Sequence, residues 1–221
     1  MLSREPLFPA AIQACMTTRS DGDLGGPSPD TRTFRKHMFQ KQIEVPADPV
    51  FMQQVHGNGL VVEPINGCVA DASVSARPGV VLAVRVADCA PLLIADAAGE
   101  RVAAVHCGWR GLAADIIRTA VAAFEDPAAA HAWLGPCIGP CHYEVDRVVR
   151  DAFTNAEGFE PVRPGHWRMD LRRVARMQLL ALGVSAVAMS DECTYCESAK
   201  YWSYRRDGTD AGRMAAMIWR R

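Results

Sequence analysis

Three residues whose side chains could do chemistry each stand where an apolar stretch of the sequence ends. His56 lies in "QQVHGNG", Cys89 in "VADCAPLL" and His106 in "VAAVHCGWRG". One thiolate and two neutral imidazoles are a typical three-ligand set for a catalytic zinc, whereas a structural zinc uses four protein ligands. Cys89 could instead be a nucleophile that gives its proton to His106. Both chemistries need a lowered thiol pKa, so the spacing leaves them open, together with a purely structural role for all three.

Three arginines are candidates for binding an anionic part of a substrate. Arg110 stands in "CGWRG", just before a predicted helix, and Arg205 and Arg206 stand in "SYRRDG". A helix N-terminus after a glycine-rich turn attracts anions, and a guanidinium binds phosphate or carboxylate through two parallel hydrogen bonds. We therefore expect these arginines to line an anion-binding wall, with Arg110 catalytic together with Cys89 and His106. Each arginine could instead form a structural ion pair with an acidic side chain.

Further cysteines could also bind a metal. Cys107 directly follows the second histidine of the set and could oxidise or compete for the metal. Cys137 and Cys141 are four residues apart, and Cys193 and Cys196 form a C-x-x-C pair, so these four could make a four-thiolate zinc knuckle. The flanking loops lack the tight knuckle pattern. We therefore expect four buried or incidental thiols.

Composition limits the classes of function. The chain has 221 residues, 49% of them hydrophobic, and a formal net charge of −1. This predicts one domain over residues 1–221 and gives no basic excess for binding nucleic acid. No apolar run approaches the roughly 20 residues that span a bilayer. Glu5 and two prolines interrupt the N-terminus where a signal peptide is apolar, so we expect a cytoplasmic protein with reduced thiols, a small-molecule substrate and no membrane partner.

Hydrophobic periodicity predicts a mixture of strands and helices. Two short strands are expected within residues 49–64, and further strands over 79–89, 90–96, 101–106, 184–190 and 212–219. Helices are expected over 112–124, 144–154 and 170–183, the last with Asp170 as its N-cap, and a surface loop over 17–32. No G-x-G-x-x-G follows a strand, which argues against a dinucleotide fold. The predicted class is α+β, with mixed β-sheets flanked by helices.

Five motifs in a fixed order resemble the laccase-domain family over about residues 50–219: "QQVHGNG", "ADCAPLLIAD", "AVHCGWRG", "LGPCIGPCHYEV" and "SYRRDG…GRMAAMIW". Members are described as multifunctional purine nucleoside phosphorylases, polyphenol oxidases or peptidoglycan editing factors. The resemblance implies that His56, Cys89 and His106 bind zinc. It also implies a single α+β domain similar in its Cys–His placement to toxin-type cysteine hydrolases.

The resemblance further implies phosphorolysis of adenosine, inosine and methylthioadenosine, and deamination of adenosine. Zinc would lower the pKa of its bound water to near 7, and the arginines would steady the phosphate. Four alternatives remain: a cytoplasmic amidase that removes misincorporated serine from a muramyl cell-wall precursor, a Cys–His thiol hydrolase, a copper polyphenol oxidase and a non-catalytic zinc-binding module. Copper is less favoured, because only two of the six histidines lie in strong motifs.

Overall fold

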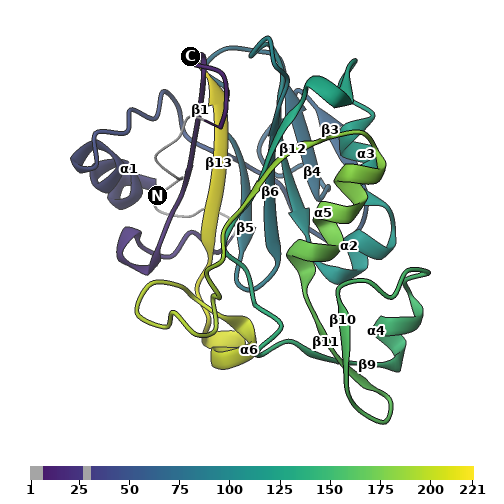
Figure 1. The fold of residues 1–221 in the computed structure, drawn as a ribbon. Helices are drawn as coiled ribbons and strands as arrows, with labels where there is room; N and C mark the ends of the chain where they lie inside the picture. Colours follow the sequence, from purple (N-terminus) through teal and green to yellow (C-terminus); the bar gives the residue numbers. More distant parts are fainter. Residues whose placement is uncertain (1–6, 27–30) are drawn as a thin grey trace.

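The computed structural model describes residues 7–26 and 31–221 of the chain. Residues 1–6 and 27–30 lie outside this description, and with them part of the N-terminal segment and of the loop expected over 17–32. Two β-sheets lie face to face, and helices cover their outer faces (Figure 1). Helix α1 lies on one side of this pair of sheets, and α3 and α5 lie on the other (Figure 1).

The first sheet has four strands in the order β1-β13-β5-β2. Its strands are β1 (Ile12–Met16), β13 (Met214–Arg220), β5 (Leu82–Val86) and β2 (Val50–Phe51). β13 pairs antiparallel with both β1 and β5, and β2 runs parallel to β5. Met217 and Trp219 of β13 belong to the same core cluster as Phe34 and Met38 of α1 (Thr31–Gln40). These contacts seat α1 on the outer face of the sheet.

The second sheet has six strands in the order β12-β8-β6-β7-β4-β3. They are β12 (Ala186–Met189), β8 (His131–Leu134), β6 (Ala90–Ala95), β7 (Val102–Cys107), β4 (Ala72–Ser75) and β3 (Leu60–Val62). The β3–β4 and β12–β8 pairs are parallel and the others antiparallel. Both β6 and β7 are buried along their whole length, because each has one face on the other sheet and one on the helices.

Alternation along β7 decides which side chains reach the space between the sheets. Ala104 belongs to the core between the sheets, while Ala103 and Val105 belong to the core under the helices. Successive strand residues point to opposite faces, so His106 faces the space between the sheets and Cys107 faces the helices. Cys107 is fully buried in that helix-side core, and burial raises the pKa of its thiol. Cys107 therefore points away from the space that holds His106, which argues against competition for the metal, and its possible oxidation stays a prediction.

The helix expected over 112–124 is two short helices. α2 (Trp109–Ala113) and α3 (Ile116–Val121) are separated at Asp115, whose φ of 62° is left-handed. An aspartate tolerates this conformation better than most residues, which is why apolar periodicity alone does not reveal the break. The helix expected over 170–183 is confirmed as α5 (Leu171–Ala181), and the Asp170 carboxylate accepts hydrogen bonds from the first backbone N–H groups.

A small third sheet has the order β10-β11-β9. It contains β10 (Phe159–Arg163), β11 (His166–Met169) and β9 (Glu144–Asp146). The helix expected over 144–154 is wrong in its first turn, since those residues form β9 and only α4 (Arg147–Asp151) is helical. Antiparallel pairing with β11 holds β9 extended, and Asp146 then caps α4.

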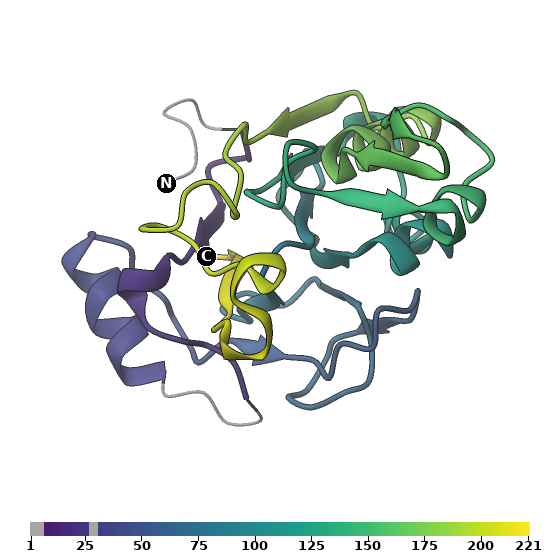
Figure 2. The same cartoon turned by 90° about the horizontal axis from the view of Figure 1, so that it is seen from below.

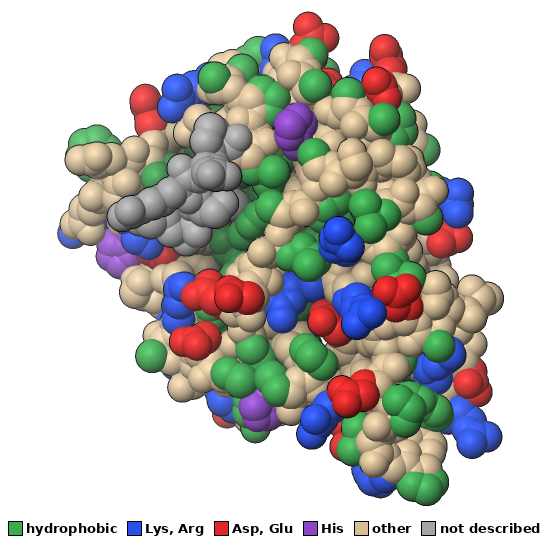
Figure 3. Space-filling model, viewed as in Figure 1, with side chains coloured by type: hydrophobic (Ala, Val, Ile, Leu, Met, Phe, Trp, Pro, Cys, Tyr) green, Lys and Arg blue, Asp and Glu red, His purple; other side chains and the backbone are tan. Residues whose placement is uncertain are grey.

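The remaining described elements are short. They are α6 (Tyr204–Asp207) and the 3-10 turns Arg19–Asp21, Pro127–Ala129 and Gly208–Asp210. Seen from below, α6 lies in the middle of the molecule between the N-terminal elements and the β9–β11 region (Figure 2). Basic and acidic side chains are interspersed on the face in Figure 3. Within residues 7–26 and 31–221, no helix is both long and apolar enough to cross a bilayer. The α+β class with mixed sheets is confirmed.

Candidate metal centre and active-site cavity

The structure brings the three predicted ligands together. His56 comes from the loop between β2 and β3, Cys89 from the turn between β5 and β6, and His106 from β7. Their ligand atoms all lie within 4.8 Å of one another. The two imidazole rings are 4.8 Å apart between centroids and nearly perpendicular, at 77°. His56 is exposed, Cys89 is half-buried and His106 is buried, so the cluster has one side toward solvent.

Asp71, which the sequence analysis missed, organises both histidines. Its buried carboxylate accepts a hydrogen bond from Nδ1 of His106 at 2.8 Å, which leaves Nε2 free to face Cys89. The same carboxylate accepts the backbone N–H groups of Val55, His56 and Gly57 at 3.1, 2.9 and 2.7 Å. A carboxylate is rarely fully buried without such partners. The sequence offers one trace of it, an acidic residue directly before the short segment Ala72–Ser75 that becomes β4.

Backbone geometry at the cluster leaves little room for change. His56 has a φ of 59°, in the left-handed region that non-glycine residues rarely adopt. Gly108 follows β7 at a position where a Cβ would lie 3.1 Å from Cδ2 of His56 and 3.2 Å from Sγ of Cys89. A side chain at position 108 would make these two ligands shift by a few tenths of an ångström. Gly108 therefore leaves room for the cluster.

Asp88 fixes the turn that presents Cys89. It is buried, and its φ of 92° is strained for an aspartate. One carboxylate oxygen accepts the Thr194 hydroxyl at 2.7 Å, and the other accepts the Ser203 hydroxyl at 3.1 Å and the Arg205 backbone N–H at 2.7 Å. The turn before Cys89 is thereby tied to the segment that carries α6. Asp88 acts on the site as a positioning residue.

The electrostatics of the cluster favour a thiolate. Burial alone would raise the pKa of the Cys89 thiol, but the charge and hydrogen bonds of His106 and His56 lower it below its usual value. Burial would lower the pKa of His106, but the Cys89 charge and the Asp71 hydrogen bond raise it instead. The protein therefore holds the thiolate that both a metal ligand and a nucleophile require.

The donor set fits a metal ion. One sulfur and two imidazole nitrogens lie within 4.8 Å of one another, and Gly108 leaves the space beside them free. Metal-bound histidines usually donate their second ring N–H to a carboxylate, as His106 does to Asp71. Three protein ligands with one exposed side leave a fourth position open, which is typical of catalytic sites. The cluster could therefore bind a metal with room for a further ligand.

A cavity of about 730 Å³ opens over the cluster. Besides the three ligands, its lining includes aromatic side chains, namely Trp109, Tyr143 and Tyr204. It also includes four arginines, namely Arg85, Arg110, Arg205 and Arg213. This volume is typical of a pocket for a small molecule. The aromatic side chains could stack on a flat ring, and the arginines could bind an anion.

The structure places two of the three predicted arginines on this wall. The Arg110 guanidinium lies over the Trp109 ring at 4.5 Å. The Arg205 guanidinium lies 5.1 Å from the Tyr143 ring and donates to the Glu144 carbonyl at 3.1 Å. Arg85 and Arg213 also line the cavity but were not predicted. Arg85 lies within β5, and Arg213 lies directly before β13, in the "GRMAAMIW" motif, where it was not singled out.

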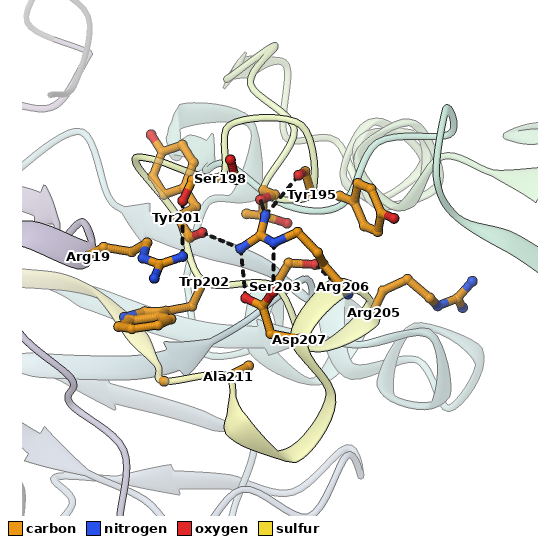
Figure 4. A network of polar contacts seen from close by, with 12 residues as sticks. Arg19, Tyr195, Ser198, Tyr201, Trp202, Ser203, Arg205, Arg206, Asp207 and Ala211 are labelled. Carbon is orange, nitrogen blue, oxygen red and sulfur yellow. Dashed lines mark hydrogen bonds and ion pairs between the residues drawn. The ribbon is translucent and has the colours of Figure 1, made fainter.

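Arg206, the third predicted arginine, does not line the cavity. It donates to the carbonyl oxygens of Thr194, Tyr195 and Tyr201 and forms an ion pair with Asp207 at 2.8 Å. Figure 4 shows these contacts surrounding its guanidinium, while the Arg205 side chain extends away from them. The two adjacent arginines therefore have different roles. Arg206 is structural and links α6 to the segment that precedes it, whereas Arg205 faces the cavity.

Two relatives named purine nucleoside phosphorylase match this chain along nearly its whole length. The protein YfiH of Shigella flexneri is 40% identical, and the match covers 96% of this chain and 95% of that protein. A second, from Pseudomonas aeruginosa, is 39% identical, with 96% of this chain and 94% of that protein covered. These names support an enzyme with a small-molecule substrate.

Solved structures show the same fold. A Neisseria meningitidis protein superposes with a TM-score of 0.84 at 34% identity, covering 97% of this chain and 96% of that one. YlmD from Geobacillus stearothermophilus superposes with a TM-score of 0.86 at 28% identity, covering 98% and 94%. The sequence profile of a family described as multi-copper polyphenol oxidoreductase laccase matches residues 28–221. The chain therefore belongs to this laccase-like family, whose relatives include proteins named purine nucleoside phosphorylase.

Proposed function

We propose that the protein is a zinc-dependent purine nucleoside phosphorylase that also accepts methylthioadenosine and deaminates adenosine. The observation that carries the proposal is the open set of His56, Cys89 and His106 within a cavity walled by aromatic rings and arginines. A non-catalytic zinc module would be expected to close the fourth metal position with a protein ligand. The names of the relatives support the same class of activity.

The cavity side chains suggest how a nucleoside and phosphate would be held. Trp109 and Tyr143 offer ring faces for a purine, and each has an arginine beside it. Arg110 and Arg205 would hold phosphate so that one of its oxygens meets C1′ of the ribose. That oxygen forms a bond to C1′ as the bond from C1′ to N9 breaks, and the electron pair leaves with the purine. Zinc, when bound, supplies a positive charge that polarises a substrate oxygen or water.

Asp71 has a separate part in this proposal. By accepting the Nδ1 proton of His106, it keeps Nε2 directed at the cluster and fixes the ring plane. By accepting three backbone N–H groups, it holds the turn that presents His56. The geometry of the set thus depends on one carboxylate.

Incubating the purified protein with adenosine, inosine or methylthioadenosine tests the activity. We expect free purine and a phosphorylated ribose only when phosphate is present, and ammonia from adenosine without phosphate. Zinc removal should abolish both products and zinc return should restore them. Purine release that is indifferent to phosphate and zinc would refute the proposal. A muramyl-serine precursor and a phenol, assayed in parallel, test the amidase and copper oxidase alternatives.

A Cys–His thiol hydrolase is the second candidate, because the lowered pKa of Cys89 and the raised pKa of His106 also suit a nucleophile and its base. Asp71 would then be the third member that orients the histidine. The two candidates differ in one respect that can be measured. A nucleophilic thiol must be reachable in the native enzyme, whereas a zinc ligand is protected.

Arg110→Ala and Arg205→Ala are each expected to weaken the apparent affinity for phosphate by about 10- to 150-fold. Loss of a hydrogen-bonded contact to a charged group costs about 1.5–3 kcal/mol. The KM for phosphate at saturating nucleoside measures the effect. Arg118→Ala is a matched control, because Arg118 is an exposed α3 residue outside the cavity lining. Wild-type KM values in both cavity variants would show that these arginines do not bind phosphate.

A further inference from the structure

A second cluster of metal-ligating side chains lies where two loops meet. Cys141 and His142 come from the loop between β8 and β9, and Cys193 and Cys196 come from the loop between β12 and α6. Their four ligand atoms all lie within 4.8 Å of one another. Cys193 is buried, while the other three residues are exposed. Exposed thiols have no packing reason to gather in this way.

Four of the distances within this cluster are close to those between the ligands of a tetrahedral ion. Sγ of Cys141 lies 3.7 Å from Sγ of Cys193 and 3.6 Å from Sγ of Cys196. Nδ1 of His142 lies 3.3 Å from the sulfurs of both Cys141 and Cys196. Zinc with bonds of about 2.3 Å to sulfur and 2.0–2.1 Å to nitrogen separates two sulfurs by about 3.8 Å and a sulfur from a nitrogen by about 3.6 Å. A disulfide would need about 2.05 Å.

Backbone groups of the two loops lie close to the sulfur atoms of the cluster. The backbone N–H of Gly139 donates to Sγ of Cys193 at 3.1 Å. A Cβ on Gly139 would lie 3.3 Å from Sγ of Cys141 and 3.4 Å from Sγ of Cys193, so a larger residue would crowd both ligands. Cys137 and Cys193 also form a parallel β-bridge, which joins the two loops directly beside the cluster.

We propose a second zinc site, closed and structural, whose ligands are Cys141, His142, Cys193 and Cys196. The C-x-x-C spacing of the last two is typical of such sites, and four protein ligands leave no open position for substrate. The four-thiolate knuckle considered from the sequence is wrong in one ligand. Cys137 is buried in the helix-side core and is not part of the cluster, and His142 takes its place. Of the four thiols expected to be buried or incidental, Cys137 and Cys193 are buried, whereas Cys141 and Cys196 are exposed.

The ion would clamp one wall of the active-site cavity. His142 stacks on Tyr195, with ring centroids 4.0 Å apart and an angle of 13°. The next residue, Tyr143, lines the cavity, and Thr194 donates to the Asp88 carboxylate beside Cys89. Both loops that carry the ligands thus reach the catalytic cluster. The second ion would stabilise this wall without touching substrate.

The zinc content of the full chain tests the site. The protein is purified without chelator, and zinc is measured by elemental mass spectrometry. We expect about two zinc ions per chain in the wild type and about one in either Cys196→Ser or Cys89→Ser. Cys68→Ser is the matched control, since Cys68 belongs to neither cluster, and it should keep both ions. Wild-type zinc content in both Cys196→Ser and Cys141→Ser would overturn the second site. Wild-type content in Cys89→Ser would instead contradict the catalytic site alone.

Cobalt(II) provides a second test that does not depend on the folding of Cys196→Ser. Metal-free Cys89→Ser should bind cobalt with the strong thiolate-to-metal absorption and the visible bands of a tetrahedral site. His142→Ala in the same background should lose the tetrahedral bands. Absence of thiolate-to-metal absorption in Cys89→Ser would overturn the proposal. A disulfide between two of Cys141, Cys193 and Cys196, identified by mass spectrometry of the non-reduced peptides, would also overturn it.

Discussion

Asp71→Asn is expected to lower the affinity of the catalytic cluster for zinc by about 10- to 100-fold, the usual effect of losing an outer partner of a metal-bound histidine. The amide has almost the shape of the carboxylate but only one acceptor oxygen. Oδ1 of Asp71 accepts from His106 and from the His56 N–H, and Oδ2 accepts from the Val55 and Gly57 N–H groups. The single amide oxygen can replace only one of these two oxygens. Either both histidines lose their acceptor, or the rest of the turn that presents His56 does. Competition with a chelator of known zinc affinity measures the change.

Asp115→Asn is the control for this variant, because Asp115 is an exposed carboxylate that pairs with Arg118, outside the metal cluster. Its zinc affinity should equal that of the wild type. Circular dichroism of the metal-free variants separates a local effect from unfolding. If Asp71→Asn folds and keeps wild-type zinc affinity, the carboxylate does not position the ligands.

Iodoacetamide is expected to leave Cys89 unmodified in the zinc-loaded protein and to modify it rapidly once the metal is removed. A ligand thiolate shares its lone pair with the metal and is protected. In the metal-free protein, His106 and His56 keep the pKa of Cys89 below its usual value, so the reactive thiolate is already present near neutral pH. Peptide mapping by mass spectrometry assigns the label to Cys89 and separates it from the other cysteines.

Two other cysteines serve as internal controls in that experiment. Cys68 is half-buried and outside both clusters, so it should label to the same extent with and without metal. Cys107 is fully buried and should label in neither state. Rapid labelling of Cys89 in the zinc-loaded protein, with activity lost in step, would instead favour the thiol hydrolase.

The parts of the site that the sequence predicted are those with a local pattern. His56, Cys89 and His106 each end an apolar stretch, and the end of a buried strand is where a rigid scaffold presents reactive groups. α5 was predictable for the same reason, since its periodicity and its N-cap lie within one short segment. One-domain organisation over residues 1–221 and the likeness to toxin-type hydrolases stay predictions.

The residues that sequence reasoning missed act across long separations. Asp71 meets His106 over 35 positions, and Asp88 meets Ser203 over 115. Nothing near either aspartate in the sequence announces those partners, because strand order decides them. Arg205 and Arg206 differ for a similar reason. Neighbouring residues point in different directions, and only the fold shows that Arg206 is surrounded by three carbonyl oxygens while Arg205 lines the cavity.

The position of β13 between β1 and β5 sets the order of events while the protein is made. A ribosome that adds about 5–20 residues per second needs about 10–40 s for the roughly 200 residues between β1 and β13. During this interval β1 lacks its partner β13, and β5 lacks it for the last roughly 130 residues. The turn that carries Cys89 then follows a strand with one unpaired edge. We therefore expect the catalytic cluster to take up its metal only after β13 has emerged, so that maturation follows translation.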